Sequence, residues 1–453
     1  MTTLNCFKAY DVRGKLGEEL NEEIAYKIGR AFAEYLNAKT IVIGCDMRTS
    51  SESLKQATIQ GIIDNGCDVI DIGMTGTEEV YFATFHLGVD GGIEITASHN
   101  PINYNGIKFV GKGSTPISGD KGLPEIKALA EANKFNTPNS LGKTTKKSIL
   151  TDYTAHLLDY IDLTAIKPMR IVVNSGNGAA GHVIDSIEQA FKQEKVPVDF
   201  IKIHHQPDGT FPNGIPNPIL LENQKVTSDA VTENKADFGV AWDGDFDRCF
   251  LFDENGSFIE GYYIVGLLAQ AFLAQNSADT VIYDPRLIWN TLDIVASSGG
   301  RAVQSKAGHA FIKQKMRNEN AVYGGEMSAH HYFKNFAFCD SGMIPWLLIA
   351  ELLSKLGKNL SNLVEERISK FPCSGEINYQ VKDTSSVLET IKQSYQQKAL
   401  SVDTTDGLGF DFEDWRFNIR PSNTEPLIRL NIEAKANPNL VAQKLHEIES
   451  LIK

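Results

Sequence analysis

The 453-residue chain lacks several features that would assign it to a broad class. Its six cysteines show no CxxC spacing and several lie in apolar runs, so we expect reduced, buried thiols. The N-terminal residues lack the apolar core of a signal peptide, and no apolar run approaches membrane-spanning length. These absences predict a cytoplasmic protein with no membrane partner.

Positive charge is also scarce. The chain has 44 lysines and arginines against 57 acidic residues, a formal net charge of −13. This balance argues against nucleic acid as a partner, so any anionic substrate must meet locally placed cations. The length predicts more than one domain, and 42% hydrophobic with 22% charged residues fits a soluble globular protein.

The recurring pattern along the chain is a buried strand that delivers polar residues to a loop. It appears three times, at Ile41–Gly44, Ile171–Val173 and Val281–Tyr283, with helical patterns nearby such as Asn21–Leu36. We therefore expect three α/β units of related plan. The polar stretch 131–148 is a candidate linker, and we expect its lysines to be solvated.

The last part of the chain has a different pattern. Strand-like runs alternate after Pro372, and Ile428, Leu430 and Ile432 share one face. A terminal helix is predicted to start at Asn437-Pro438, with asparagine as cap and proline in the first turn. This part reads as a smaller α+β domain.

The most informative motif is a cluster of alternating aspartates, Asp243, Asp245 and Asp247, followed by Arg248. It lies between two apolar runs that read as buried strands, Phe238–Trp242 and Cys249–Phe252. Three hard oxygen ligands at this spacing can converge on a divalent cation, at the strand end where ligands bind in open α/β sheets. With further coordination positions open, magnesium serving a phosphate group fits best.

Two other interpretations of this motif stay open. Asp-Gly is a favoured hairpin turn, so the cluster could be only a solvated tip. A calcium loop would use the aspartates at its first, third and fifth positions, and Glu254 falls at its twelfth. However, Arg248 replaces the required glycine, and strand-like runs replace the flanking helices.

A second loop, Thr96–Pro101, follows the run Gly92–Ile95. It could be an ordinary turn in which Ser98 bonds to backbone. A serine hydrolase is a poor alternative, because no G-x-S-x-G motif is present and His99, being adjacent, is not expected to reach Ser98 as a base. Ser98 can instead carry a phosphoryl group, whose charge would need the cation of the aspartate loop.

Two further loops have polar side chains suited to a sugar phosphate. In Gly324–His330, paired glycines allow close backbone approach, and the polar side chains suit sugar hydroxyls. In Arg420–Pro426, an arginine with hydrogen-bonding side chains makes a phosphate cradle. Each loop taken alone could equally be a polar turn.

Together the four loops resemble those of the α-D-phosphohexomutase family, most closely its bacterial phosphomannomutases, over essentially the whole chain. They are similar, in chain order, to the family's phosphoserine, metal, sugar-recognition and phosphate-binding loops: Thr96–Pro101, Asp243–Arg248, Gly325–His330 and Arg420–Pro426. Shorter matches are Tyr10–Gly14, Asn105–Lys108 and Gly308–Lys313.

The resemblance implies a heart-shaped, four-domain architecture around one cleft, with three similar α/β domains and a C-terminal α+β domain. The expected limits, in the order of the four loops, are 1–148, 149–256, 257–368 and 369–453.

The activity implied is an intramolecular phosphotransfer. Mannose 1-phosphate and mannose 6-phosphate would be reversibly interconverted through phosphorylated Ser98 and a hexose 1,6-bisphosphate, which also acts as activator, to supply GDP-mannose for polysaccharide synthesis. One Mg²⁺ per chain is implied, held by Ser98, Asp243, Asp245 and Asp247. The resemblance further implies catalytic roles for Ser98, Arg13, Lys108, His330 and Arg248. Substrate contacts are implied for His309, Arg286, Glu326, Ser328, Arg420, Ser422, Asn423 and Thr424.

Several alternatives remain at this point. Lys108 and His330 are candidates for proton transfer, or else a snorkelling lysine and a turn histidine. Mannose and glucose differ only at C2, so a phosphoglucomutase or an enzyme of dual specificity is also compatible. A metal-dependent phosphatase and a non-catalytic sugar-phosphate-binding protein are the other classes. The sequence does not indicate an oligomeric state.

Overall fold

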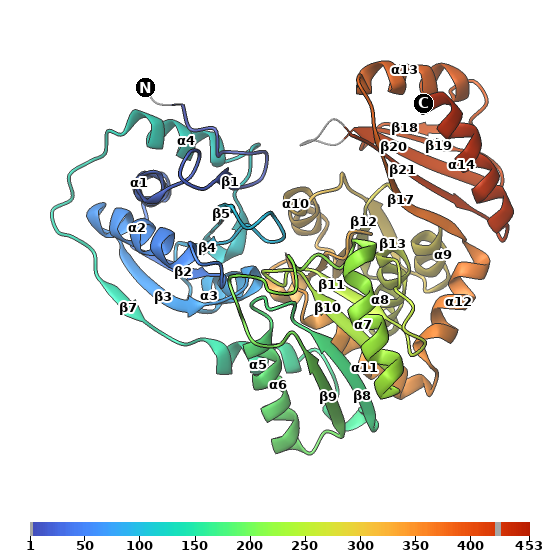
Figure 1. The fold of residues 1–453 in the computed structure, drawn as a ribbon, viewed down its shortest axis with the longest axis horizontal. Coiled ribbons are helices and arrows are strands. Elements are labelled where there is room, and N and C mark those ends of the chain that lie inside the picture. The colour runs from blue at the N-terminus through green and yellow to red at the C-terminus, as the bar shows by residue number, and fades with distance from the viewer. Residues whose placement is uncertain (1–2, 422–426) are drawn as a thin grey trace. The chain divides into compact units, whose positions relative to one another are not determined.

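The computed structural model describes residues 3–421 and 427–453 (Figure 1). The chain divides into two compact units: unit 1 is Met1–Phe258 with Tyr332–Gly357, and unit 2 is Ile259–His331 with Lys358–Lys453. In the described ranges, every helix is too short or too polar to cross a membrane.

The first sheet of unit 1 has the strand order β1-β5-β4-β2-β3-β7, with β6 paired to β5. Strand β2 lies between β3 and β4 and pairs in parallel with both, whereas β4 and β5 are antiparallel. Its strands are β1 Val12–Lys15, β2 Thr40–Cys45, β3 Asp68–Met74, β4 Gly91–Ile95, β5 Tyr104–Gly111, β6 Thr115–Pro116 and β7 Thr144–Lys146. Its helices are α1 Glu22–Leu36, α2 Ser51–Asp64, α3 Thr77–His86 and α4 Leu123–Ala132.

The predicted first helix is present as α1. Its N-cap is Asn21, whose side chain accepts a hydrogen bond from the Ile24 amide, and it ends at Asn37 in the left-handed conformation. Its buried face, which includes Ile28 and Phe32, packs into the core of the first sheet.

The second sheet of unit 1 has the order β11-β10-β8-β9. Strand β8 pairs in parallel with β9 and β10, and β10 is antiparallel to β11. The aspartate motif therefore connects two paired strands, as the flanking apolar runs predicted. The strands are β8 Met169–Asn174, β9 Val198–Ile203, β10 Phe238–Trp242 and β11 Cys249–Phe252. The helices that accompany this sheet are α5 Leu150–Leu158, α6 Gly181–Glu194, α7 Leu221–Asn234 and α11 Ile344–Leu356. Strands β15 His331–Phe333 and β16 Cys339–Asp340 do not belong to this sheet, and they pair with each other through Tyr332 and Phe333.

Unit 2 repeats this pairing. Strand β12 pairs in parallel with β13 and β14. The strands are β12 Thr280–Tyr283, β13 Arg301–Gln304 and β14 Tyr323–Gly325, with helices α8 Gly261–Gln275, α9 Trp289–Ser297, α10 His309–Glu319 and α12 Leu360–Lys370.

The three α/β sheets also share a turn. In each sheet, a polar residue at or just after the end of the middle strand accepts a hydrogen bond through its side-chain oxygen from the amide two residues later. The accepting residues are Asp46, Asn174 and Asp284, and the distance is 2.9 Å in each case. The repeated strand order and turn confirm the prediction of three related α/β units.

The C-terminal sheet of unit 2 is antiparallel, with the order β17-β21-β20-β19-β18. The predicted apolar face is buried under α13 and α14 (Figure 1). Asn437 caps α14 by accepting from the Leu440 amide, as predicted. The elements are β17 Cys373–Gln380, α13 Thr384–Tyr395, β18 Ser401–Asp403, β19 Leu408–Asp411, β20 Trp415–Pro421, β21 Leu427–Ala434 and α14 Pro438–Ile452.

The expected linker and the cysteines can also be compared with their predictions. The stretch expected as a linker contains strand β7, which pairs in parallel with β3, so part of it belongs to the first sheet. Its lysines at 143, 146 and 147 are exposed, as predicted. The cysteines are free thiols, and all but the half-buried Cys373 are buried, as expected.

Candidate functional site

The loop after β4 places Ser98 in a constrained conformation. Ser98 has a positive φ of 51° and is 4% exposed. Its amide donates to Thr96 Oγ1 at 2.9 Å, and Thr96 Oγ1 donates to Asp46 Oδ2 at 2.7 Å. Arg48 then ties the loop together by donating to the carbonyl oxygens of Ser98, Asn100, Pro101 and Tyr104. The strain of a left-handed serine is thus offset by contacts that fix the direction of its hydroxyl.

The Ser98 hydroxyl points at the aspartate motif, 145 residues away in sequence. Ser98 Oγ donates to Asp243 Oδ2 at 2.8 Å and lies 2.9 Å from His99 Nδ1. The ring of His99 therefore lies within reach of Ser98, although its adjacency was expected to make this hard, and the backbone at Ser98 is left-handed. Arg248 also donates to His99 Nδ1, which occupies its single lone pair and leaves Asp243 as the acceptor for the serine proton.

The three aspartates converge as the spacing predicted. One carboxylate oxygen from each lies within 4.8 Å of the others, and all three side chains are buried. Asp243 Oδ1 and Asp245 Oδ1 are buried without a hydrogen-bond partner among the described residues. Buried carboxylate oxygens normally have a partner, so this set fits a divalent cation with oxygen ligands. The solvated hairpin tip is excluded by the burial.

Basic side chains hold the other oxygens of the cluster. Lys108 donates to Asp245 Oδ2 at 2.7 Å and Asp247 Oδ2 at 2.6 Å. Burial works to lower the pKa of Lys108, but these carboxylates outweigh it and raise the pKa above the usual value. Arg248 donates to Asp243 Oδ2 through Nε and Nη2, and against the effect of burial it keeps the pKa of Asp243 below its usual range.

Thr77, the first residue of α3, is a site residue that the sequence analysis missed. Its hydroxyl donates to Asp245 Oδ2 at 2.6 Å and accepts from Lys108 at 3.2 Å. Its amide donates to the Asp245 carbonyl at 3.1 Å. No local pattern marks Thr77, because the partner lies 168 residues away.

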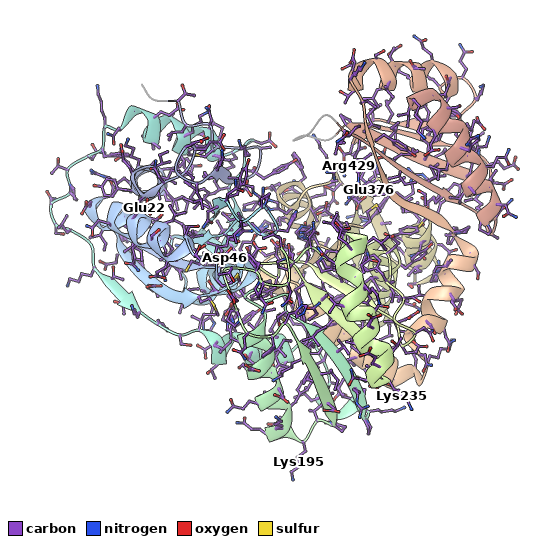
Figure 2. The ribbon with its side chains drawn as sticks, viewed as in Figure 1. Glu22, Asp46, Lys195, Lys235, Glu376 and Arg429 are labelled. Atoms are coloured by element: carbon purple, nitrogen blue, oxygen red, sulfur yellow. The ribbon has the colours of Figure 1, made fainter. Side chains whose placement is uncertain are left out.

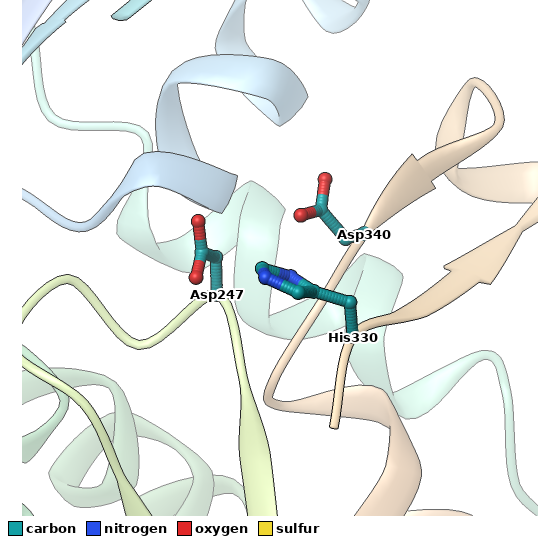
Figure 3. A group of neighbouring side chains, drawn as sticks. All are labelled: Asp247, His330 and Asp340. Atoms are coloured by element: carbon teal, nitrogen blue, oxygen red, sulfur yellow. The ribbon is translucent and has the colours of Figure 1, made fainter. Parts of the chain in front are cut away.

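A fourth carboxylate was also missed. Asp340 on β16 is 1% exposed, and one of its oxygens lies within 4.8 Å of a carboxylate oxygen of Asp247 (Figure 3).

Arg13 on β1 completes the basic side chains that were predicted in unit 1. It pairs with Asp11 and donates to the side-chain oxygen of Asn100, in the Ser98 loop.

In unit 2 the predicted residue Arg286 is buried, with 3% of its surface exposed. It makes a two-bond pair with Asp284, both at 2.9 Å, and contacts Ser328 Oγ at 3.3 Å and Glu326 at 3.5 Å. Asp284 Oδ2 also accepts from the Met327 amide at 2.8 Å. The Asp-x-Arg turn therefore supports this loop as Asp46 and Arg48 support the Ser98 loop, a repeat that the sequence already shows.

The predicted sugar-recognition loop closes on itself. The Glu326 amide donates to the His330 carbonyl at 2.9 Å, and Glu326 Oε1 accepts from the Gly308 amide at 2.8 Å. That second contact brings Glu326 to the start of α10, whose first residue is His309. The structure thus brings Arg286, Glu326 and Ser328 together and places the helix that carries His309 beside them.

Arg420, at the end of β20, is 9% exposed and pairs with Glu376 at 3.1 Å and Asp406 at 3.9 Å. Glu376 on β17 was missed by the sequence analysis. It also pairs with Arg429 on β21 at 3.2 Å (Figure 2). A third pair joins Glu376 to Arg286 at 3.5 Å. The other predicted phosphate contacts, Ser422, Asn423 and Thr424, lie outside the described residues.

Comparison with family models covers nearly the whole chain. Residues 4–137, 151–256 and 260–371 match α/β/α domains I, II and III of phosphoglucomutase/phosphomannomutase, and residues 376–451 match its C-terminal domain. The family is metal-dependent, in agreement with the acidic cluster of unit 1.

Several curated relatives match over full length. A phosphomannomutase of Escherichia coli is 59% identical over 456 residues, covering 100% of both chains. A phosphomannomutase of Vibrio cholerae is 58% identical, covering 100% of this chain and 99% of its own. Proteins of Xanthomonas campestris named phosphohexose mutases are 51% identical, again covering 100% of both chains.

Solved structures share the fold. A phosphoglucomutase/phosphomannomutase family protein from Burkholderia thailandensis superposes with a TM-score of 0.89 at 29% identity, covering 100% of this chain and 98% of the other. A second solved structure, from Thermus thermophilus, gives a TM-score of 0.81 at 22% identity, covering 99% of this chain and 100% of the other. From the domain order, the full-length relatives and the fold, the chain belongs to the phosphoglucomutase/phosphomannomutase family and is an intramolecular phosphotransferase.

Proposed function

We propose that the chain acts as a phosphomannomutase, which reversibly interconverts mannose 1-phosphate and mannose 6-phosphate through phosphorylated Ser98 and a hexose 1,6-bisphosphate. The observation that carries this proposal is the contact of Ser98 Oγ with Asp243, in a cluster where Asp243 Oδ1 and Asp245 Oδ1 lack hydrogen-bond partners among the described residues. Relatives at 56–59% identity with the name phosphomannomutase support the choice of reaction.

The first transfer breaks the bond between phosphorus and Ser98 Oγ and forms one to the O6 hydroxyl of mannose 1-phosphate, which loses its proton. Such a transfer needs in-line positioning and charge neutralisation. Arg13, Lys108 and Arg248 supply positive charge in unit 1. Lys108 and His330 are the proposed proton-transfer groups. Because its pKa is raised, Lys108 enters the reaction as an ammonium group, so it would donate a proton to Ser98 Oγ as the bond to phosphorus breaks, while His330 would accept the proton from O6.

A Mg²⁺ ion would be held by Asp243, Asp245, Asp247 and an oxygen on Ser98, where it would neutralise charge on the transferred group. In this structure Asp243 accepts a hydrogen bond from Ser98 Oγ, which is the oxygen that would carry the phosphoryl group.

The second transfer returns the phosphoryl group at O1 to Ser98 after the bisphosphate has turned over. The sugar must therefore be recognised in both orientations. We propose that Glu326 and Ser328 contact the O3 and O4 hydroxyls, which keep their arrangement when the ring flips, with Arg286 and His309 as further contacts. The distal phosphate is assigned to Arg420, Ser422, Asn423 and Thr424.

We also propose four domains with the limits 1–148, 149–256, 257–368 and 369–453. The proposed setting is the cytoplasm, where the product would supply GDP-mannose synthesis.

Phosphorus NMR tests the reaction. Purified protein with magnesium, mannose 1-phosphate and a trace of glucose 1,6-bisphosphate should form mannose 6-phosphate. Ser98→Ala should abolish this conversion, and Ser53→Ala, which changes an exposed serine of the same unit, should not. Release of inorganic phosphate would mean a phosphatase, and an unchanged spectrum would refute the assignment. The same experiment with glucose 1-phosphate tests dual specificity.

A further inference from the structure

Arg420, the arginine assigned to the distal phosphate, belongs to a cluster of ion pairs in unit 2. Arg420 and Arg429 lie directly opposite each other on the paired strands β20 and β21. Glu376 on β17 contacts both, through Oε2 to Arg420 and Oε1 to Arg429, and Figure 2 shows Glu376 beside Arg429. Its Oε2 also lies 3.5 Å from Arg286. One carboxylate thus engages three guanidinium groups.

This cluster lies on the face of the C-terminal sheet that is turned away from the apolar core. The core-facing side chains of β21 include Ile428 and Leu430, so Arg429 between them points to the opposite face. Glu376 is adjacent in the same sheet, with its side chain only 14% exposed. Although burial works to raise the pKa of Glu376, the arginines outweigh it and lower the pKa, so the group is an anion at neutral pH.

The arginines of the cluster are matched by carboxylates. In the described residues, the three guanidinium groups form ion pairs with the carboxylates of Asp284, Glu326, Glu376 and Asp406. A site meant to hold a phosphate dianion as tightly as possible would keep its arginines free of counter-charge. Here the arginine assigned to phosphate already has a carboxylate partner.

We propose that Glu376 is a positioning residue that competes with substrate phosphate for Arg420 and Arg429 and so weakens phosphate binding. The inference rests on the proposed function, in which one cradle must release one phosphate and accept the other in every turnover. Tight, uniform binding would lower KM without raising kcat, and it would slow that exchange. A built-in carboxylate provides the arginines with a partner when the phosphate leaves.

The test uses Glu376→Gln in the full-length chain, with inorganic phosphate titrated by calorimetry and mannose 1-phosphate as the kinetic substrate. We expect phosphate to bind about tenfold more tightly, which corresponds to about 1.4 kcal/mol, with KM and kcat both lower. A carboxylate that only stiffened the arginines would give the opposite shift, a weaker affinity and a higher KM. An unchanged or weaker phosphate affinity therefore overturns the proposal.

Three matched variants sharpen the result. Glu376→Asp keeps the charge and should stay near the wild type. Glu413→Gln makes the same charge change at an exposed position of the same unit and should change neither constant. The gain from Glu376→Gln should disappear when Arg420→Ala is added, because the competition needs that arginine.

A further variant covers a folding failure of Glu376→Gln. Asp406→Asn removes the carboxylate 3.9 Å from Arg420 and should tighten phosphate binding in the same direction, by a smaller factor. Failure of the proposed function would appear as absent turnover in the wild type. The calorimetric comparison between wild type and variants would then still decide the role of Glu376.

Discussion

Replacing Thr77 with valine should weaken metal binding at the aspartate cluster. The substitution keeps the shape of the side chain and removes only the hydroxyl that donates to Asp245 Oδ2 at 2.6 Å. Asp245 Oδ1 is the oxygen without a partner among the described residues, and it belongs to the same carboxylate. Fixing Oδ2 therefore sets the direction in which Oδ1 is offered to a cation.

The expected loss of Mg²⁺ affinity depends on the hydrogen bonds that Asp245 keeps after the substitution. A hydrogen bond to a charged group contributes about 1.5–3 kcal/mol. Lys108 still holds Asp245 Oδ2 at 2.7 Å, so the loss belongs at the lower end. About 1.4 kcal/mol corresponds to a tenfold change in affinity, and loss of an outer-sphere partner typically weakens metal binding by roughly 10–100-fold. We expect Mg²⁺ to bind about tenfold more weakly to Thr77→Val.

The assay is calorimetric titration of Mg²⁺ into the purified protein, which needs no turnover. Thr77→Ser restores the hydroxyl and should return the affinity to near the wild-type value. Thr84→Val makes the same chemical change on the same helix, where the hydroxyl donates to the Val80 carbonyl, and should leave Mg²⁺ affinity unchanged. Equal Mg²⁺ affinity in Thr77→Val and the wild type would refute the reasoning.

Three other predictions follow from the structure. Arg48→Lys should lower kcat by about 100-fold with little change in KM, because lysine cannot donate to all the carbonyl oxygens through which Arg48 fixes the Ser98 loop. An unchanged kcat in steady-state kinetics would contradict this. Burial raises the pKa of Glu94 well above its usual value, so the folded state binds its proton more tightly than the unfolded state, and the stability this contributes below about pH 4.3 is lost as pH rises. Glu94→Gln should therefore gain in melting temperature relative to wild type between pH 4.5 and 8, and a constant difference across this range would exclude the effect. Ile448→Ala in the buried face of α14 should lower the free energy of unfolding by about 2–5 kcal/mol, as measured by denaturant unfolding. A loss under about 1 kcal/mol, as expected at an exposed site, would contradict the burial of this side chain.

Much of the fold follows from local patterns. The alternation of Ile428, Leu430 and Ile432, the cap at Asn437 and the apolar runs around the aspartates each depend on neighbours in sequence, and the structure has each element as predicted. The spacing of the three aspartates likewise predicted a converging cluster, because alternation in one turn is itself a local property.

What the sequence did not predict depends on distance or on backbone handedness. Thr77 and Glu376 act on partners that are far away along the chain, and no local pattern marks a threonine or a strand glutamate for such a contact. The contact between Ser98 and His99 was missed for a different reason. It needs the positive φ of Ser98, a conformation that residue type alone does not favour.

The three α/β sheets show how one backbone plan supports different chemistry. In each, the third parallel strand ends in a functional loop: Ser98 after β4, the aspartates after β10 and Glu326 after β14. Each loop contains one non-glycine residue with positive φ, namely Ser98, Phe246 or Ala329, at 51°, 43° and 69°. In the first and third sheets the aspartate of the preceding turn also bonds to the loop. Since the backbone plan is shared, the roles proposed for the loops in phosphoryl transfer, cation binding and sugar contact would depend on their side chains, so substitutions in these loops should change chemistry with little effect on the fold.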